Sequence, residues 1–229
     1  MSLPKRAKTG GRTAQVSPGG IVAAGVRVGL AGLTVQAVAA ELGVTSTAVY
    51  RRVPSRQALE RLVGEAVLAE LVITDDPTRS AAEHLVTFAA ELRAFTLARP
   101  GAAAYFQRVF PRGASGVRLL EAEVAALGAR GYAPEAAVVL SSAVARTALG
   151  HAAAQEAREA AAAANPGAVE AEVDAALAAV ASSLVLAAAH ARIPPTSEER
   201  QFHLLMTATV AGLLATLPPG RPLSEVLPG

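Results

Sequence analysis

A short segment near the N-terminus carries hydroxyl and basic side chains in a pattern that suits DNA. Gly43 ends one predicted helix, and the short helix that begins after it has a polar side. The polar residues of this second helix are Thr45, Ser46, Thr47, Tyr50, Arg51 and Arg52. Hydroxyls at the start of a short helix suit phosphates or base edges, and arginines suit phosphates or guanine. The alternative is a solvated helix end that binds nothing.

A second group of residues has the composition of a small-molecule pocket. Five of the eight aromatic residues fall in one short region, namely Phe88, Phe95, Tyr105, Phe106 and Phe110. Three polar residues interrupt a later apolar helix, namely Arg146, His151 and Gln155. Because ligand pockets are apolar and aromatic with few polar groups, we expect these residues to line one. The alternatives are core packing for the aromatics and a surface or interface role for the polar three.

Residues for covalent or metal chemistry lack the spacing that such chemistry needs. The sequence has no cysteine, which excludes disulfides and thiolate metal sites. The histidines, none at metal-ligand spacing, are His84, His151, His190 and His203. The segment Gly113-Ala114-Ser115-Gly116 lacks the second glycine position of a nucleophile elbow. We therefore predict no enzymatic activity, no metal and no cofactor.

Helices must position these residues, because alanine occupies 55 of the 229 positions and aromatics only 3%. Alanine is the strongest helix former, and β-branched and aromatic residues do not alternate as they do in strands. Glycines, prolines and polar caps divide the predicted all-α chain. The expected helices cover about 18–28, 35–42, 46–52, 56–71, 78–98, 102–110, 115–130, 133–164, 167–191 and 197–217.

Charge and chain breakers divide the sequence into regions. Residues 1–72 carry nine Lys and Arg against four Glu, whereas the remainder carries 12 basic and 15 acidic residues. This asymmetry predicts a polyanion partner for the first third, the alternative being a solvated charged face. The expected regions are a flexible basic arm (1–16), a helix-turn-helix domain with its connecting helix (17–72), a ligand-binding and dimerisation domain (77–217) and a proline-rich tail (218–229).

Residues 17–72 resemble the tetracycline-repressor (TetR) family of bacterial regulators. The matching residues are Ile21-Val22-Ala23-Ala24, Gly32-Leu33-Thr34-Val35, Ala39, Leu42-Gly43-Val44, Val49-Tyr50, Val53-Pro54-Ser55-Arg56 and Ala58-Leu59. The later part of the chain matches only through Leu97–Gly101 and the final apolar helix. Between Ala24 and Gly32 the sequence is about one helical turn shorter than the family pattern, so the first helix is expected to be short.

The resemblance implies an all-helical homodimer with a DNA-reading helix at 45–52. It also implies a C-terminal domain with a ligand cavity and a dimer interface made by two late helices. By position, Thr34, Tyr50 and Arg56 are implied to contact DNA phosphates. The residues implied to lie nearest the bases are Gln36, Ser46, Thr47 and Arg51. Arg52 is implied to contact either a phosphate or a base.

Two stripes of small residues support dimerisation independently of the resemblance. They are Ala143, Thr147, Gly150 and Ala154, followed by Leu205, Thr209, Gly212 and Thr216. Stripes of this kind allow another helix to approach closely, and the partner is either a second copy or the same subunit. Their helices, residues 133–164 and 197–217, are too poor in charge to face water entirely.

The sequence therefore predicts a cytoplasmic regulator, a repressor rather than an activator, that binds double-stranded operator DNA. A small apolar effector is expected to release the homodimer from DNA, and no membrane partner is expected. Two alternatives stay open. One is a helical ligand-binding protein with a degenerate DNA-binding head, and the other is a helical enzyme that uses the same pocket.

Overall fold

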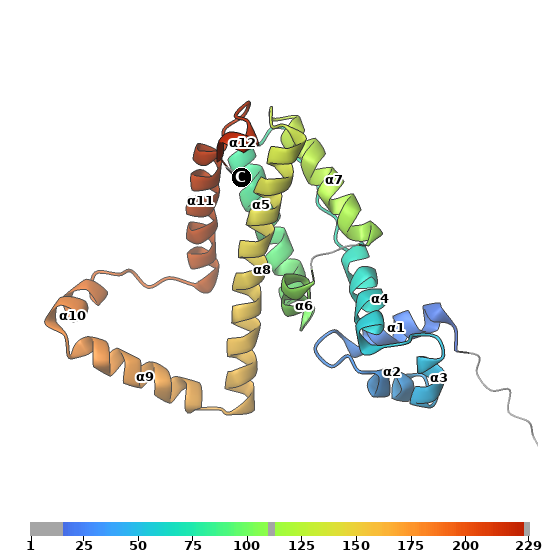
Figure 1. Ribbon diagram of the computed structural model, residues 1–229. Helices are drawn as coiled ribbons and strands as arrows, with labels where there is room; N and C mark the ends of the chain where they lie inside the picture. The colour runs from blue at the N-terminus through green and yellow to red at the C-terminus, as the bar shows by residue number, and fades with distance from the viewer. Residues whose placement is uncertain (1–15, 110–112, 227–229) are drawn as a thin grey trace, which may run out of the picture. The chain divides into compact units, whose positions relative to one another are not determined.

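The computed structural model describes residues 16–109 and 113–226, which form helices joined by turns and loops (Figure 1). The helices are α1 (Pro18–Val28), α2 (Val35–Glu41), α3 (Ser46–Tyr50), α4 (Arg56–Ala69), α5 (Ala81–Leu97), α6 (Ala102–Arg108), α7 (Ala114–Gly128), α8 (Pro134–Ala164), α9 (Ala168–Ala181), α10 (Leu184–His190), α11 (Glu198–Thr216) and α12 (Leu223–Val226). The described ranges contain no strand, which confirms the all-α prediction. The chain separates into two compact units, Met1–Val63 and Gly64–Gly229.

Hydroxyl side chains begin the helices of the first unit. Ser17, Thr34, Thr45 and Ser55 each accept a hydrogen bond from the backbone N–H three residues further on, over 3.0–3.3 Å. Such a bond satisfies one of the backbone donors that a helix leaves open at its N-terminus. All four caps agree with the starts predicted from the sequence.

The first unit packs its short helices around a few small apolar side chains. Ile21 of α1, Val38 of α2 and Val49 of α3 are fully buried. Gly25 lets α1 approach α4, since a Cβ at this position would collide with the side chain of Val63. Gly43 has φ of +64°, the left-handed conformation that the turn between α2 and α3 requires. The unit therefore has the helix-turn-helix arrangement expected from the sequence.

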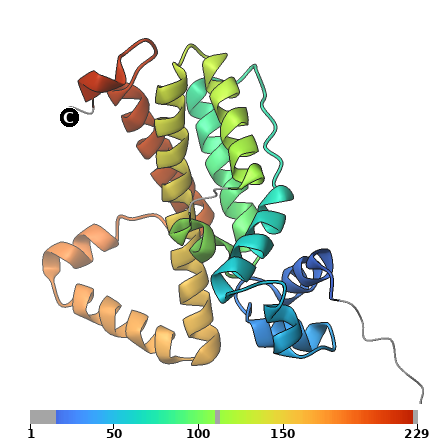
Figure 2. The ribbon, with the colours of Figure 1, turned by 45° about the vertical axis from the view of Figure 1, so that its right-hand side comes forward.

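The second unit is built around α8, which runs through its middle (Figures 1 and 2). Helices α5, α6, α7 and α11 all pack against α8. Leu140 and Val144 of α8, Leu85 of α5 and Met206 of α11 are fully buried. Among the described residues α8 alone is a single helix long and apolar enough to cross a membrane, and 44% of its apolar window is buried inside the protein. Its neighbours identify it as the core helix of this bundle.

Helices α9 and α10 leave the bundle as a helical hairpin, which we call the α9–α10 arm (Figure 1). Neither helix has a buried residue. The sequence predicted one helix over 167–191, but the chain breaks at Ser182 and Ser183 and turns sharply, by 116° between the helices. The side chain of Ser183 caps α10 by accepting from Leu186 N, and this local bond favours a new helix over continuation.

Candidate functional sites

The first candidate site is the exposed side of α3 in the N-terminal unit. Val49 holds α3 against the core, while Thr47, Arg51 and Arg52 are exposed and the Tyr50 ring is 45% exposed. Ser46 is half-buried, and Thr45 forms the N-cap. Neither arginine forms an ion pair with a described residue, so both guanidinium groups are available to an anion.

Residues flanking α3 add further polar groups in the same unit. Gln36 is exposed on α2, and the Thr34 hydroxyl caps that helix, with its oxygen 3.0 Å from Ala37 N. Arg56 pairs with Glu60 over 2.9 Å, one turn along α4. An exposed pair at this spacing is weak, so a phosphate can compete for the guanidinium.

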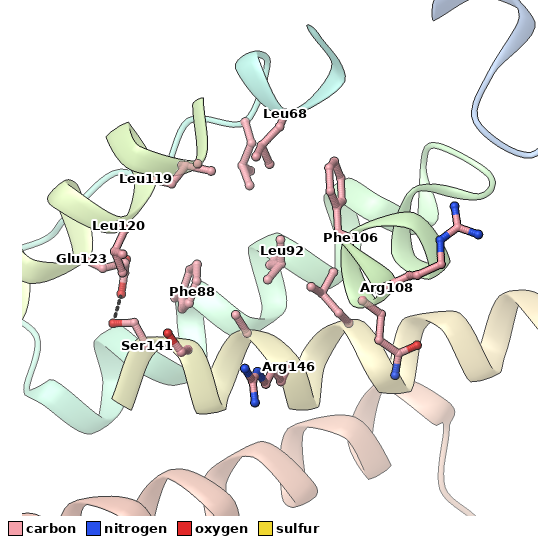
Figure 3. A pocket seen from close by; sticks show the side chains of 16 residues that line it. Leu68, Phe88, Leu92, Phe106, Arg108, Leu119, Leu120, Glu123, Ser141 and Arg146 are labelled. Atoms are coloured by element: carbon pink, nitrogen blue, oxygen red, sulfur yellow. Dashed lines mark hydrogen bonds between the residues drawn. The ribbon is translucent and has the colours of Figure 1, made fainter. Parts of the chain in front are cut away.

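The second candidate site is a cavity of about 440 Å³ in the C-terminal unit (Figure 3). Its apolar walls come from the end of α4, from α5 and α6, and from α7 and α8. The apolar side chains of these walls include Leu68, Phe88, Leu92, Phe106, Leu119 and Leu120. The polar residues that line it are Gln107, Arg108, Glu123, Ser141, Ser142 and Arg146. The volume falls in the range of small-molecule sites.

One end of this cavity is formed by a buried polar cluster. Glu123 of α7 is 2% exposed, and its Oε2 lies 3.2 Å from Nε2 of the buried His84. Ser141 of α8 donates its hydroxyl to the same oxygen over 3.4 Å. The other ring nitrogen of His84, Nδ1, lies 3.2 Å from Asp75 Oδ1. Arg130 in turn donates to Asp75 over 2.8 Å, and this hydrogen bond holds the pKa of Asp75 below its ordinary value.

The second oxygen of Glu123 has no such support. Oε1 is buried and has no hydrogen-bond partner in the described part of the chain. An acceptor in this state costs about 1–3 kcal/mol, which native proteins rarely leave uncompensated. In Figure 3 Glu123 and Ser141 lie at one end of the cavity, and Phe106 and Arg108 lie at the other. The lining of the cavity is therefore mostly apolar, with polar groups at both ends and Ser142 and Arg146 on the side formed by α8.

No model of a protein family matches the sequence, and no curated protein matches it. Solved structures do resemble this fold. Apo ActR from Streptomyces coelicolor has a TM-score of 0.72 at 24% identity, covering 89% of this chain and 97% of that one. The structure of the TetR family protein ActR in complex with actinorhodin has a TM-score of 0.73 at 24% identity. The match covers 90% of this chain and 100% of that one. This chain has the TetR-family fold.

Two further TetR-fold structures come from other bacteria. A TetR variant from Acinetobacter baumannii in complex with minocycline has a TM-score of 0.60 at 21% identity, covering 87% of this chain and 97% of that one. BioQ from Mycobacterium smegmatis has a TM-score of 0.63 at 21% identity, and the match covers 88% of this chain and 99% of that one. The TetR fold thus extends across both units and is not limited to the residues that resemble the family in sequence.

The TetR-fold structure brings together only part of the ligand site expected from the sequence. Phe88, Phe106 and Arg146 line the cavity. Tyr105 is buried edge-on against Phe106, and Phe95 lies beneath the guanidinium of Arg99 at 3.9 Å. Phe110 lies outside the described residues.

His151 and Gln155 belong to a different polar cluster, on the side of α8 that faces α5 and α11. Gln155 accepts a hydrogen bond from Arg93, and that guanidinium lies 4.9 Å from the centre of the Phe202 ring. His151 meets the same ring edge-on at 5.0 Å. Burial, and then the positive charge of Arg93, lower the pKa of His151.

Sequence reasoning missed the polar end of the cavity, although a signal for it exists. Glu123 stands one helical turn from Leu119 and one turn from Leu127, so it shares the buried face of α7. A carboxylate on an apolar helix face needs partners inside the protein. His84 occupies a comparable position on α5, four residues before Phe88.

Proposed function

We propose that the chain is a TetR-family transcriptional regulator that binds operator DNA through α3. The observation that carries this proposal is the exposed side of α3 on a fold shared with TetR regulators. Val49 anchors the helix, and Thr47, Tyr50, Arg51 and Arg52 remain open to solvent. A helix of this kind reads the major groove with its N-terminal residues while neighbouring groups hold the backbone.

The capping threonines fit a second role at the phosphates. The Thr34 and Thr45 oxygens accept backbone hydrogen bonds in the caps. A hydroxyl still has its O–H to donate, and phosphate oxygens accept such donors. Gln36 and Ser46 are proposed to lie near base edges, and Arg56 to exchange its exposed Glu60 partner for phosphate.

The cavity in the C-terminal unit supports control by a small-molecule effector. The similar structures of ActR with actinorhodin and of a TetR variant with minocycline each contain a small molecule. We assign this chain an effector of its own, bound between α5, α7 and α8. Such a ligand shifts the DNA-binding equilibrium only by its different affinity for the two states. The expected outcome is release of DNA, which makes the regulator a repressor.

A homodimer is supported by apolar surface that the single chain leaves uncovered. In the α9–α10 arm Leu184 is 90% exposed and Val185 is 78% exposed, and on α11 Leu204 is 71% exposed. Large apolar side chains exposed to this extent are candidates for an interaction site. The proposed interface combines α8 and α11 with the arm. A Cβ at Gly212 meets nothing within 4 Å, which leaves this face of α11 open to a partner helix.

The proposed regulator works by binding, without a cofactor and without catalysis, in the cytoplasm. Its test is a selection of double-stranded DNA from a random pool by the full-length chain. We expect enrichment of a near-palindromic sequence whose half-sites are about one helical turn apart or a multiple of that. Failure to enrich any sequence, with ligand binding retained, would favour a ligand-binding protein with a degenerate DNA-binding head.

A further inference from the structure

The unpartnered oxygen of Glu123 restricts what the cavity can hold. Glu123 lines the cavity, and its Oε1 is buried without a partner. Its Oε2 faces Ser141 (Figure 3) and the ring of His84. A buried carboxylate oxygen without a donor is unfavourable, and the cost is removed when a donor arrives. The cavity therefore has a preference for one kind of ligand group at this end.

The residues that contact Glu123 in the described part of the chain do not supply a donor to this oxygen. Both ring nitrogens of His84 already face carboxylates, at 3.2 Å from Glu123 and 3.2 Å from Asp75. Arg130 holds Asp75 on the far side over 2.8 Å. Ser141 donates its single proton to Oε2. None of these contacts supplies a donor to Oε1, and a ligand group in the cavity can do so.

The rest of the cavity lining determines which kind of molecular frame the ligand can have. Between the Glu123 end and the Arg108 end, most lining side chains are apolar, among them Leu68, Phe88 and Leu92 (Figure 3). Ser142 and Arg146 of α8 also belong to the lining. A mostly apolar cavity of about 440 Å³ suits a flat or compact hydrocarbon frame of two or three rings. A strongly polar body would lose its hydration here without replacement.

We infer that the effector is an apolar, multi-ring compound with a hydrogen-bond donor, an amine or a hydroxyl, that binds Glu123 Oε1. This inference rests on the proposed effector role of the cavity and names the chemistry that the effector must have. An amine donates as a cation to the carboxylate, and a hydroxyl donates as a neutral group. Charge-assisted bonds are the stronger of the two, so the amine is the preferred form.

The test is a set of matched probes measured by fluorescence with the full-length protein in the absence of DNA. The probes are aminomethylanthracene, hydroxymethylanthracene, methylanthracene and anthracenecarboxylate. We expect the amine to bind roughly 10–100-fold more tightly than the methyl compound, with the hydroxyl between them and the carboxylate weakest. Equal affinities for the amine and methyl probes, as when a water molecule satisfies Oε1, would overturn the inference. So would a lack of binding by every probe.

Two variants and one control locate the effect. Glu123→Gln keeps the shape of the side chain and should remove most of the amine preference. Glu121→Gln changes an exposed carboxylate on the same helix and should leave the preference unchanged. Ala145→Phe fills the cavity from α8 and should weaken all four probes together. Persistence of the amine preference in Glu123→Gln, or full probe affinity in Ala145→Phe, would contradict the inference.

The design separates this inference from the proposed function. Probe binding is measured without DNA, so loss of DNA binding by the chain leaves the result intact. Conversely, an apolar probe that releases DNA without any preference for a donor would keep the regulator and remove the role of Glu123. A thermal melt of each variant confirms that it is folded before affinities are compared.

Discussion

Individual arginines at the end of α3 are expected to set the DNA affinity of the first unit. Replacing Arg51 or Arg52 by alanine removes a cation that has no ion-pair partner among the described residues. Removal of one phosphate-binding cation should lower the slope of log affinity against log salt by about one unit. The measurement is a salt titration on the DNA enriched by selection. Arg192→Ala, exposed in the second unit, is the matched control. Unchanged slopes in both α3 variants would exclude these arginines from the interface.

The titration of His151 provides a test within the second unit. Its lowered pKa means that the folded state favours the neutral ring, through burial and then the charge of Arg93. The free energy of unfolding should therefore fall as pH decreases from about 6.5 through the lower folded pKa. Arg158 and Glu198 also act on the ring, in opposite directions.

The corresponding experiment compares melting temperatures at neutral and mildly acidic pH. His151→Leu should lose less stability on acidification than the wild type, since it has no ring to protonate. His190→Ala, on the exposed helix α10, corrects for the removal of a histidine as such. Equal pH dependence in the wild type and His151→Leu would show that this ring does not affect the acid response.

Sequence reasoning at single residues worked where a motif fixed the spacing. The exposed residues of α3 and the threonine caps follow from a short pattern of residues close together in the chain. Glu123 and Ser141 were missed because they meet through the packing of α7 on α8, 18 positions apart. Of the four described aromatics in the cluster, Phe88 and Phe106 line the cavity and Phe95 and Tyr105 do not, because clustering in sequence does not fix which face of a helix each ring takes.

Among the helices, the close contact between α1 and α4 is sensitive to a single methyl group. Gly25→Ala places a Cβ against the Val63 side chain and should destabilise the first unit by about 1–3 kcal/mol. Gly19→Ala, at the start of α1, adds the same group where nothing lies within 4 Å. The melting temperature and the DNA affinity should fall in Gly25→Ala and stay unchanged in Gly19→Ala. If Gly25→Ala leaves the melting temperature unchanged, α1 and α4 are not in close contact at this position.

Helix starts were predictable because caps are local, whereas the break in the α9–α10 arm was not. An alanine-rich run with two serines reads as one helix by propensity, and nothing in its periodicity marks Ser182–Ser183 as a turn. The packing partner of the stripe residue Gly150 also could not be predicted without the structure. A Cβ there would lie 3.3 Å from Gln107 Nε2 of the same chain, which is the intrasubunit alternative for that position.

For the whole molecule, the proposed dimer depends on apolar surface in the α9–α10 arm. Leu184→Glu with Val185→Glu places charges on two highly exposed apolar positions and should shift the protein from dimer to monomer. Val72→Glu changes an exposed apolar residue in the turn after α4 and serves as the control. Sedimentation at micromolar concentration gives the result. A wild-type protein that sediments as a monomer would refute the dimer.

Ligand in the cavity and DNA on α3 are proposed to oppose each other. The most direct measurement is the affinity of the selected DNA with and without saturating aminomethylanthracene. A coupling of about 1–3 kcal/mol predicts that the probe weakens DNA binding roughly 5–150-fold, and that DNA weakens probe binding by the same factor. Equal DNA affinities at full occupancy of the cavity, or an absence of selective DNA binding, would show that this chain is not a ligand-controlled regulator.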